Sequence, residues 1–517
     1  MAAPHLVFQQ ALAELSSCLC RVPPQTQEGC AELLQAAVAW AAPGSEADIE
    51  QKVPERAVVL AKASLKLLKA AVAAAGDKGE SERATTAEAG QAKDESALSS
   101  EEVYCSTCST SDQSVEGDAP SRTLVTEATD GNVQTGFTDD TQPHPGSSGE
   151  CPFQGFQRYA AAPLLLLCGA HTQEWPWTSE ASRTHTKLLL RSLLKLSGCD
   201  TVTDLLRGAP DQQPACRIFN EALELLSPRL CKETWESNPD AKLVFSWMLH
   251  QVSRPWLSEF LSRIMPPSLL LSDDYRRENK LLGISCLHHI IKNVPAADLR
   301  QFNRALVVYH ALRNHLYTTD TAVTEASLSC ILDLLPVVQK SPPAIGEYQK
   351  EADNPADQIM QLVLTNMEME HRIDLRRLYA RFLPTLQDRL QFRVIRHMKR
   401  LMNVIVGYLE VYDGLEETSR LCILETLQGT IKYAWPRIPC RVSLLLKALL
   451  KLMYEVTCEP TPVPESVTEA LLCRATDCLV LLNQCCKGRV KTALEGILSL
   501  CNEPRLVNCI KKVQQSA

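Results

Sequence analysis

The feature that most constrains the fold is a long succession of apolar residues at helical spacing. From residue 151 to residue 517 such segments follow one another, and proline closes many of them. One segment places Ile284, Leu287 and Ile291 on one face and ends before Pro295. Residues three and four positions apart lie on the same side of an α-helix. The pattern therefore predicts helix after helix and no β-sheet.

Length decides between a single bundle and an extended array. A stretch of more than 300 residues of consecutive helices exceeds what one hydrophobic core can cover. Helix starts expected near Asp273 and Thr319 are 46 residues apart, which lies within the period of about 40–47 residues typical of HEAT-type repeats. We therefore predict an all-α fold, an α-solenoid of degenerate HEAT/armadillo-like helical repeats.

The same spacing gives local expectations. A helix that includes Leu257 is expected to stop at Pro266 and Pro267, because proline disrupts a helix interior. Asp273 and Asp274 are expected to cap the helix that follows. Leu299, Phe302, Leu306 and Tyr309 continue the apolar spacing and predict one further helix, and Gly283 is expected to permit close helix approach.

Composition divides the chain into three regions. Residues 1–75 predict an N-terminal helical segment, and residues 151–517 predict the helical repeat array. Between them, residues 76–150 contain 16 acidic and 4 basic residues, much Ser and Thr, and almost no large aliphatic residues. Such a segment cannot bury enough apolar surface to offset its ordering entropy. We predict a disordered acidic Ser/Thr-rich linker, whose clusters resemble phosphorylation sites or merely solvate the chain.

Charge and cysteine usage limit the possible partners and location. The net charge is −8, without a clustered excess of Lys and Arg large enough to predict nucleic-acid binding. The longest apolar run, residues 160–170, is too short to cross a bilayer. Several of the 21 cysteines lie among leucines, as buried thiols do in reducing compartments. We expect a protein of the cytoplasm, with the nucleus as a second location. We expect that it is not secreted and binds no membrane.

The chain shows none of the spacings that enzymes use for phosphate binding, for a nucleophilic serine or for catalytic zinc. Cys105 and Cys108 have zinc or redox spacing, but no second pair accompanies them. His288 and His289 are adjacent and cannot chelate one ion together from a helix. We predict no catalytic residue, no cofactor and no metal site.

One stretch is locally basic. Between residues 372 and 400 nine basic residues stand against Asp374 and Asp388. We call the nine the arginine cluster; they are Arg372, Arg376, Arg377, Arg381, Arg389, Arg393, Arg396, Lys399 and Arg400. The cluster is either a solvated helix face or a partner-binding patch for an acidic protein, since Arg is favoured at interfaces.

Tryptophan beside proline marks two further positions. Trp175 and Trp177 lie in EWPW, and Trp435 lies in AWPRIP. Each ring is expected to fill a junction between helices, and a surface hot spot is the alternative.

Two consecutive segments resemble the signature region of the Tel-two-interacting protein two family. They are PWLSEFLSRIMPPSLLL (255–271) and SDDYRRENKLLGISCLHHII (272–291). The positions that carry the resemblance are Asp273, Asp274, Tyr275, Lys280 and Gly283, with Asn303 standing where the pattern leads us to expect Gly. AWPR (434–437) and the acidic insertion add to it.

The resemblance implies a non-enzymatic scaffold or adaptor subunit of the Triple T co-chaperone complex. Its partners would be the Tel-two protein and its first interacting protein. Through the chaperone machinery it would act indirectly on phosphatidylinositol-kinase-related kinases, assisting their maturation and stability and so DNA-damage checkpoint and growth signalling. The alternative is a transport-receptor-like or phosphatase-scaffold-like solenoid that binds other protein cargo.

Overall fold

The structure is a computed structural model. It describes residues 34–39, 41–43, 52–83, 152–208, 217–339, 354–458, 462–498 and 503–515. These residues form helices joined by turns and contain no β-strand, which confirms the all-α prediction. Contacts divide the chain into a large unit, residues 1–68 with 157–517, and a small unit, residues 69–156. The large unit holds the repeat array described below.

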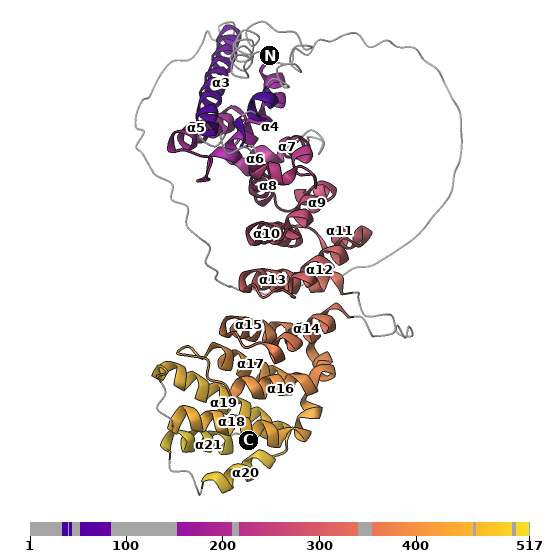
Figure 1. Cartoon of the computed structure of the whole chain (residues 1–517), viewed down its shortest axis with the longest axis vertical. Coiled ribbons are helices and arrows are strands. Elements are labelled where there is room, and N and C mark those ends of the chain that lie inside the picture. The colour runs from indigo at the N-terminus through magenta and orange to yellow at the C-terminus, as the bar shows by residue number, and fades with distance from the viewer. Residues whose placement is uncertain are drawn as a thin grey trace, which may run out of the picture. The chain divides into compact units, whose positions relative to one another are not determined.

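Beyond residue 260 the helices alternate between two layers. The first layer consists of α9 (Leu261–Ser272), α12 (Arg304–His315), α14 (Pro355–Met369), α16 (Met398–Leu409) and α18 (Val442–Cys458). The second layer consists of α10 (Arg277–Asn293), α13 (Thr321–Val338), α15 (Ile373–Leu390), α17 (Thr418–Tyr433) and α19 (Glu465–Cys485). Each second-layer helix packs on the first-layer helix before it and on the next second-layer helix. Figure 1 shows α10, α13, α15 and α17 one below another.

The period of the array agrees with the sequence. α10 begins at Arg277 and α13 at Thr321, a step of 44 residues. α15, α17 and α19 begin at Ile373, Thr418 and Glu465, so the last two steps are 45 and 47 residues. These three steps lie in the range of about 40–47 residues for HEAT-type repeats, whereas the step from α13 to α15 is longer, at 52 residues. The chain is an α-solenoid, as predicted.

The remaining helices precede, connect or follow these pairs. Those before the array are α3 (Val53–Arg83), α4 (Pro152–His171), α5 (Glu180–Leu196), α6 (Val202–Arg207), α7 (Ile218–Leu226), η3 (Ser227–Arg229), η4 (Trp235–Ser237), α8 (Pro239–Gln251) and η5 (Trp256–Phe260). The connecting helices are α11 (Ala296–Arg300), η6 (Gln301–Asn303), η8 (Gln391–His397) and η9 (Trp435–Cys440). α20 (Arg489–Leu498) and α21 (Pro504–Gln515) close the array.

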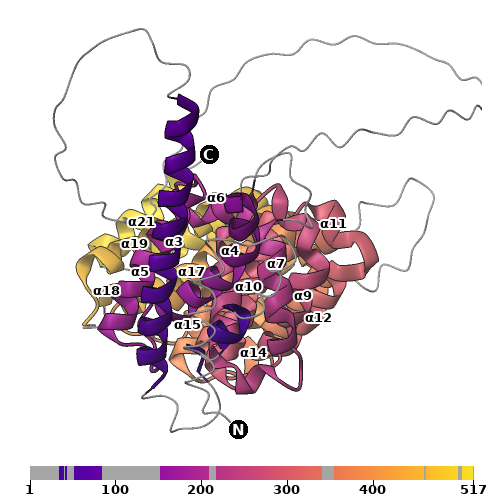
Figure 2. The ribbon, with the colours of Figure 1, turned by 90° about the horizontal axis from the view of Figure 1, so that it is seen from above.

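The array has two different edges. Turns inside a pair, such as residues 316–320 between α12 and α13, lie at one edge, which we call the turn edge. Links between pairs, such as η8 and η9, lie at the opposite edge, which we call the connection edge. This follows because the helices of each pair run in opposite directions. Figure 2, a view from above, separates the layers: the first-layer helices α9 and α12 appear on one side, and the second-layer helices α15 and α17 appear toward the other.

Apolar packing between the layers forms the core. Ile284, Leu287 and Ile291 of α10 are buried as predicted. α13 is long and apolar enough to span a membrane by length and composition alone. Its polar residues interrupt the apolar sequence, so it contains no apolar run as long as residues 160–170. More than half of that helix is buried against its neighbours, and it carries Glu325 and Asp333, which form ion pairs. A helix in the core of a repeat array has the same composition.

Two local expectations about α9 and α10 were wrong. Pro266 and Pro267 lie inside α9, which begins after the short helix η5. Asp273 and Asp274 do not cap α10: its N-cap is Arg276, without a side-chain cap bond. The Asp274 carboxylate instead accepts a hydrogen bond from the side-chain amide of buried Asn279, with the two atoms 2.6 Å apart. This contact with a residue in the first turn of α10 takes the place of the expected cap.

The predicted helix through Leu299 and Tyr309 is interrupted. Phe302 and Asn303 adopt left-handed backbone angles, φ 54° and 57°, between α11 and α12. A left-handed residue cannot continue a right-handed helix, and Asn tolerates that conformation better than most residues. This accounts for Asn303 at a position where Gly was expected.

Gly283 confirms the expectation of close approach. A Cβ atom built there would collide with the backbone of Leu271 and Ser272 at the end of α9. The predicted linker, residues 76–150, lies mostly outside the described residues, and its disorder stays a prediction. α3 continues through residues 76–83, so that part of the segment is helical.

Candidate interaction surfaces

The arginine cluster does not form one surface. Its first three members lie at the turn edge and bind groups within the chain. The Arg372 guanidinium donates to the carbonyl oxygen of Thr319 at 2.7 Å, which links two successive turns. The Arg376 guanidinium lies 3.8 Å from the ring centre of buried Tyr408, a cation–π contact.

Arg377 forms the firmest of these links. Its guanidinium donates to the Asp413 carboxylate, with Nε and Oδ2 3.2 Å apart, and to the Asp413 carbonyl oxygen. Asp413 is only 5% exposed and also accepts a hydrogen bond from the Ser419 amide near the start of α17. Arg377 therefore fixes the turn between α16 and α17 to α15.

Three more members pair across the repeats. Arg381 lies 3.7 Å from Glu325, Arg396 lies 3.4 Å from Asp357, and Arg400 lies 2.7 Å from Glu368. Half-exposed pairs of this kind contribute about 0–1 kcal/mol each. Only Arg389, Arg393 and Lys399 make no side-chain bond to the part of the chain that the structure describes. The nine residues thus split into a bound majority and an unpaired minority.

A second network at the turn edge was not visible in the sequence. Arg420, 5% exposed, lies 3.1 Å from Glu417 and 3.2 Å from Glu455. Glu417 is almost fully buried and begins α17 with a left-handed backbone, φ 46°. Burial raises the pKa of Glu417 in spite of the nearby Arg420 charge. Glu417 and Arg420 have the i, i+3 spacing of a helical ion pair, but spacing does not show that both side chains are buried or that Glu455 joins them.

The tryptophan prediction is confirmed for one ring and wrong for another. Trp177 is buried, and its indole nitrogen donates to the carbonyl oxygen of Ala170 at 3.1 Å. Trp175 is half-buried and stacks on it. Trp435, in contrast, is 61% exposed in η9 at the connection edge. The sequence pattern was misleading because the buried face of this segment is formed by Ile438 instead.

Exposed rings recur at the connection edge. Phe302 in η6 is 78% exposed, and Phe392 in η8 is 68% exposed. Each ring, like that of Trp435, belongs to a 3₁₀ link between pairs. Both Phe residues have a basic neighbour within two positions, namely Arg304 and Arg393. In the sequence, an aromatic residue in a link between two predicted helices was the signal that could have predicted these exposed rings.

Large apolar side chains are also exposed at the turn edge. They occupy the turns and adjacent helix ends of successive pairs: Tyr275, Tyr317, Met369, Ile373, Val411, Tyr412 and Leu415. The neighbouring charges there are of both signs. This edge is therefore an apolar surface without a charge preference.

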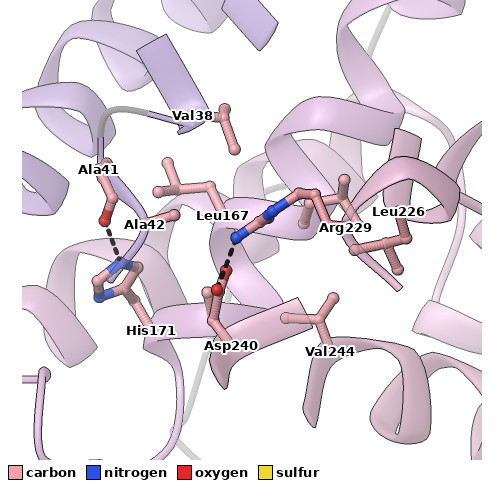
Figure 3. A pocket seen from close by; sticks show the side chains of 11 residues that line it. Val38, Ala41, Ala42, Leu167, His171, Leu226, Arg229, Asp240 and Val244 are labelled. Carbon is pink, nitrogen blue, oxygen red and sulfur yellow. Dashed lines mark hydrogen bonds and ion pairs between the residues drawn. The ribbon is translucent and has the colours of Figure 1, made fainter. Parts of the chain in front are cut away.

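A small pocket near the N-terminal segment offers little room (Figure 3). Val38 and Ala41 line it, with Ala41 beside His171 of α4, and Arg229 pairs with Asp240 of α8 at 2.6 Å. His171 Nε2 donates to the Ala41 carbonyl oxygen at 3.1 Å, and burial lowers the pKa of the imidazole. The space left is about that of one water molecule. These contacts join the segment to the array and leave no room for a cofactor.

Three cysteines and the adjacent histidines of α10 have structural surroundings. Cys286 is buried and unpaired, and burial raises its pKa to about 11. Cys485 and Cys486 are free thiols. His288 lies 2.8 Å from Asp333, whereas His289 contacts the Val252 carbonyl oxygen.

Within the described ranges, no group of three or more His, Cys, Asp or Glu side chains could hold a metal ion. Cys105 and Cys108 lie outside those ranges.

The comparisons with known proteins agree with the predicted resemblance. The Tti2 family model matches residues 207–413. The chain is 49% identical over 357 residues to TELO2-interacting protein 2 of Homo sapiens, covering 69% of this chain and 70% of that protein. It is 48% identical to the protein of the same name from Rattus norvegicus, with 72% of each covered.

Among solved structures, importin beta is similar over 71% of this chain and 47% of that one. The sequence identity is 13% and the TM-score 0.39, too low to carry an argument. The sequence relatives are decisive, because close to half of all aligned residues are identical over most of both proteins. The chain belongs to the Tti2 family, the family of the mammalian TELO2-interacting protein 2.

Proposed function

We propose that this chain is a non-enzymatic scaffold subunit that binds a TELO2-type protein within the Triple T co-chaperone complex. The observation that carries the proposal is the high identity to relatives whose name is TELO2-interacting protein 2. In that complex, with the Tel-two protein's first interacting protein, it assists chaperone-dependent maturation and stability of phosphatidylinositol-kinase-related kinases. Checkpoint and growth signalling depend on it through those kinases.

The architecture suits such a role. A solenoid's repeats contact mainly their neighbours, so the array presents a long surface to another protein. Here that surface offers an apolar turn edge and a basic, aromatic connection edge. Exposed apolar and aromatic side chains in rows are typical of protein-binding surfaces.

Co-purification tests the proposal. The tagged chain, expressed in cells, should recover a TELO2-type protein and its other helical partner in stoichiometric amounts, and its depletion should lower the steady-state level of the kinases. Recovery of transport factors or phosphatase subunits in their place would favour the alternative solenoid functions. Imaging should find the chain in the cytoplasm and also in the nucleus.

The non-enzymatic part has its own test. The purified chain should neither bind nor hydrolyse ATP, as measured by calorimetry and phosphate release. Saturable binding at micromolar ATP would contradict it, and a chain denatured beforehand controls for trace contaminants.

A further inference from the structure

We propose that the links η8 and η9 form a docking site for an acidic protein segment with regularly spaced apolar residues. The inference rests on the proposed function in one respect, that the chain holds other proteins. It adds the place of contact and the chemistry of the occupant. We call the site the η8–η9 site; its members are Arg389, Phe392, Arg393, Trp435, Arg437 and Arg441.

The first argument is exposure of the two rings. Phe392 and Trp435 are more than 60% exposed, although each shares its helix with a buried apolar residue, Val394 in η8 and Ile438 in η9. Gln391 ends α15 with a left-handed backbone, φ 50°, and Phe392 follows it directly. Large aromatic rings are frequent anchors at the centre of protein interfaces.

The second argument is charge. Arg389 and Arg393 flank Phe392, and Arg437 and Arg441 follow Trp435. None of the four side chains makes a hydrogen bond or ion pair with a residue that the structure describes, which contrasts with the bound arginines at the turn edge.

Acidic groups close to these links are occupied. The Asp388 carboxylate accepts a hydrogen bond from the Tyr433 hydroxyl at 3.1 Å. Asp357 lies between Arg396 and His397, 3.4 Å and 2.8 Å away. Asp388 keeps its negative charge, but the four arginines of the site outnumber it, so the site carries excess positive charge and its complement is an acidic partner.

The spacing of the rings defines the occupant further. η8 and η9 are successive links, on either side of the pair α16 and α17. Packed helices are about 8–10 Å apart, and a segment in the polyproline II conformation advances about 3.1 Å per residue with three residues per turn, which places every third side chain on one face. An apolar residue at every third position of an acidic segment would meet both rings.

A protein segment is favoured over single-stranded nucleic acid. The whole chain is acidic, with a net charge of −8 and a pI of about 5.9. Single-strand binders stack successive bases on aromatic rings, which rings on separate repeats do not allow. The arginines beside the rings also suit a partner with carboxylates, because one guanidinium can donate two parallel hydrogen bonds to the two oxygens of a carboxylate.

The test measures binding of a fluorescent fifteen-residue peptide, which repeats Glu-Glu-Leu five times, to the full chain. Binding is followed by the fluorescence anisotropy of the peptide. Replacing both rings, F392A with W435A, should weaken binding at least tenfold, and so should R393E with R437E. The matched control, Y275A with R276E, changes an exposed ring and its neighbouring arginine at the turn edge and should stay within twofold. Thermal melts of all three variants verify folding.

Peptide controls define the chemistry. Peptides that repeat Glu-Glu-Ser or Lys-Lys-Leu should bind at least tenfold more weakly, and added salt should weaken Glu-Glu-Leu binding to the unmodified chain. A photo-crosslinker at one leucine of the peptide should label residues 389–441 of the unmodified chain, a result that does not depend on how any variant folds.

Four outcomes overturn the inference: no binding of the Glu-Glu-Leu peptide, equal loss in the turn-edge control, crosslinks elsewhere, or tighter binding of a fifteen-nucleotide oligouridine. Recovery of the TELO2-type protein in the co-purification together with any of these would leave the proposed function standing while removing this site. Peptide binding without that recovery would do the reverse.

Discussion

At the turn edge, Arg377 and Arg420 bind carboxylates within the chain, whereas at the connection edge Arg393 and Arg437 lie beside exposed rings and make no side-chain bond to a described residue. Arg377 and Arg420 contact Asp413 and Glu417, which are nearly or fully buried. Arg393 lies only sixteen residues after Arg377 and has no such acceptor among the described residues. The difference shows that an arginine becomes structural where a neighbouring turn supplies a buried carboxylate. The predictions below test that contrast, from the largest effect to the smallest.

Removing Arg420 should have the largest effect. Arg420→Ala leaves Glu417 buried without its partner, so we expect a loss of about 3–5 kcal/mol in the free energy of unfolding, measured by urea denaturation. Lys451→Ala is the control, because Lys451 lies 3.8 Å from the Glu455 carboxylate but is half-exposed. It should cost less than about 1 kcal/mol.

The Arg420→Ala loss should depend on pH. Burial already raises the pKa of Glu417, and without Arg420 the pKa rises further. A carboxyl whose pKa is raised on folding takes up a proton in the folded state, so stability falls as pH rises above the ordinary value of about 4.3. The loss should be larger at pH 8 than at pH 5. An equal loss at both would argue against a buried, charged Glu417.

Charge reversal at the two edges compares them directly. Arg377→Glu places a second negative charge beside buried Asp413, and we expect a loss of about 2–4 kcal/mol in unfolding free energy, since Arg377 itself is partly exposed. Arg437→Glu changes an exposed side chain and should stay within about 0.5 kcal/mol. Similar values for the two variants would remove the distinction between the edges.

Packing at the turn edge should be equally intolerant of added volume. Gly283→Ala forces a Cβ atom onto the Ser272 backbone, so we expect a loss of about 1–3 kcal/mol or more by thermal denaturation. Gly407→Ala in α16 is the control, because a Cβ there meets nothing within 4 Å. It should stabilise the chain by about 0.5–1 kcal/mol, as Gly-to-Ala does in helix interiors.

Acid should loosen the turn edge through His315. The imidazole is buried at the end of α12, and burial lowers its pKa to about 4. Because the unfolded value is about 6.5, stability is lost as pH falls from 6.5 toward 4. We expect a loss on the order of 1–2 kcal/mol at pH 5, which should shrink in His315→Leu. An unchanged pH dependence in that variant would exclude His315 as the cause.

Replacing residues 84–150 with a short Gly/Ser linker should have the smallest effect. The segment lacks the apolar content needed for a core. The melting midpoint and helical circular dichroism should match those of the full chain. A drop of several degrees would show that the segment packs on the array.

The sequence alone determined the fold class, the repeat period and most of the core. Apolar residues at helical spacing are a local signal, so the buried faces of α10 and α18 follow directly from the pattern. The close approach at Gly283 was also readable, because a glycine inside a helix needs a packing reason. The family resemblance rested on short motifs in the same region.

Only the tertiary structure decided which charged and aromatic residues are structural. Arg377 and Asp413 are 36 residues apart, and their pairing depends on how one repeat packs on the next. Trp435 likewise faces outward while Trp177 is buried, although both lie beside proline in the sequence. Helical spacing records which side of one helix is apolar. It does not record which acceptor the adjacent repeat presents, because that contact forms only when the repeats stack.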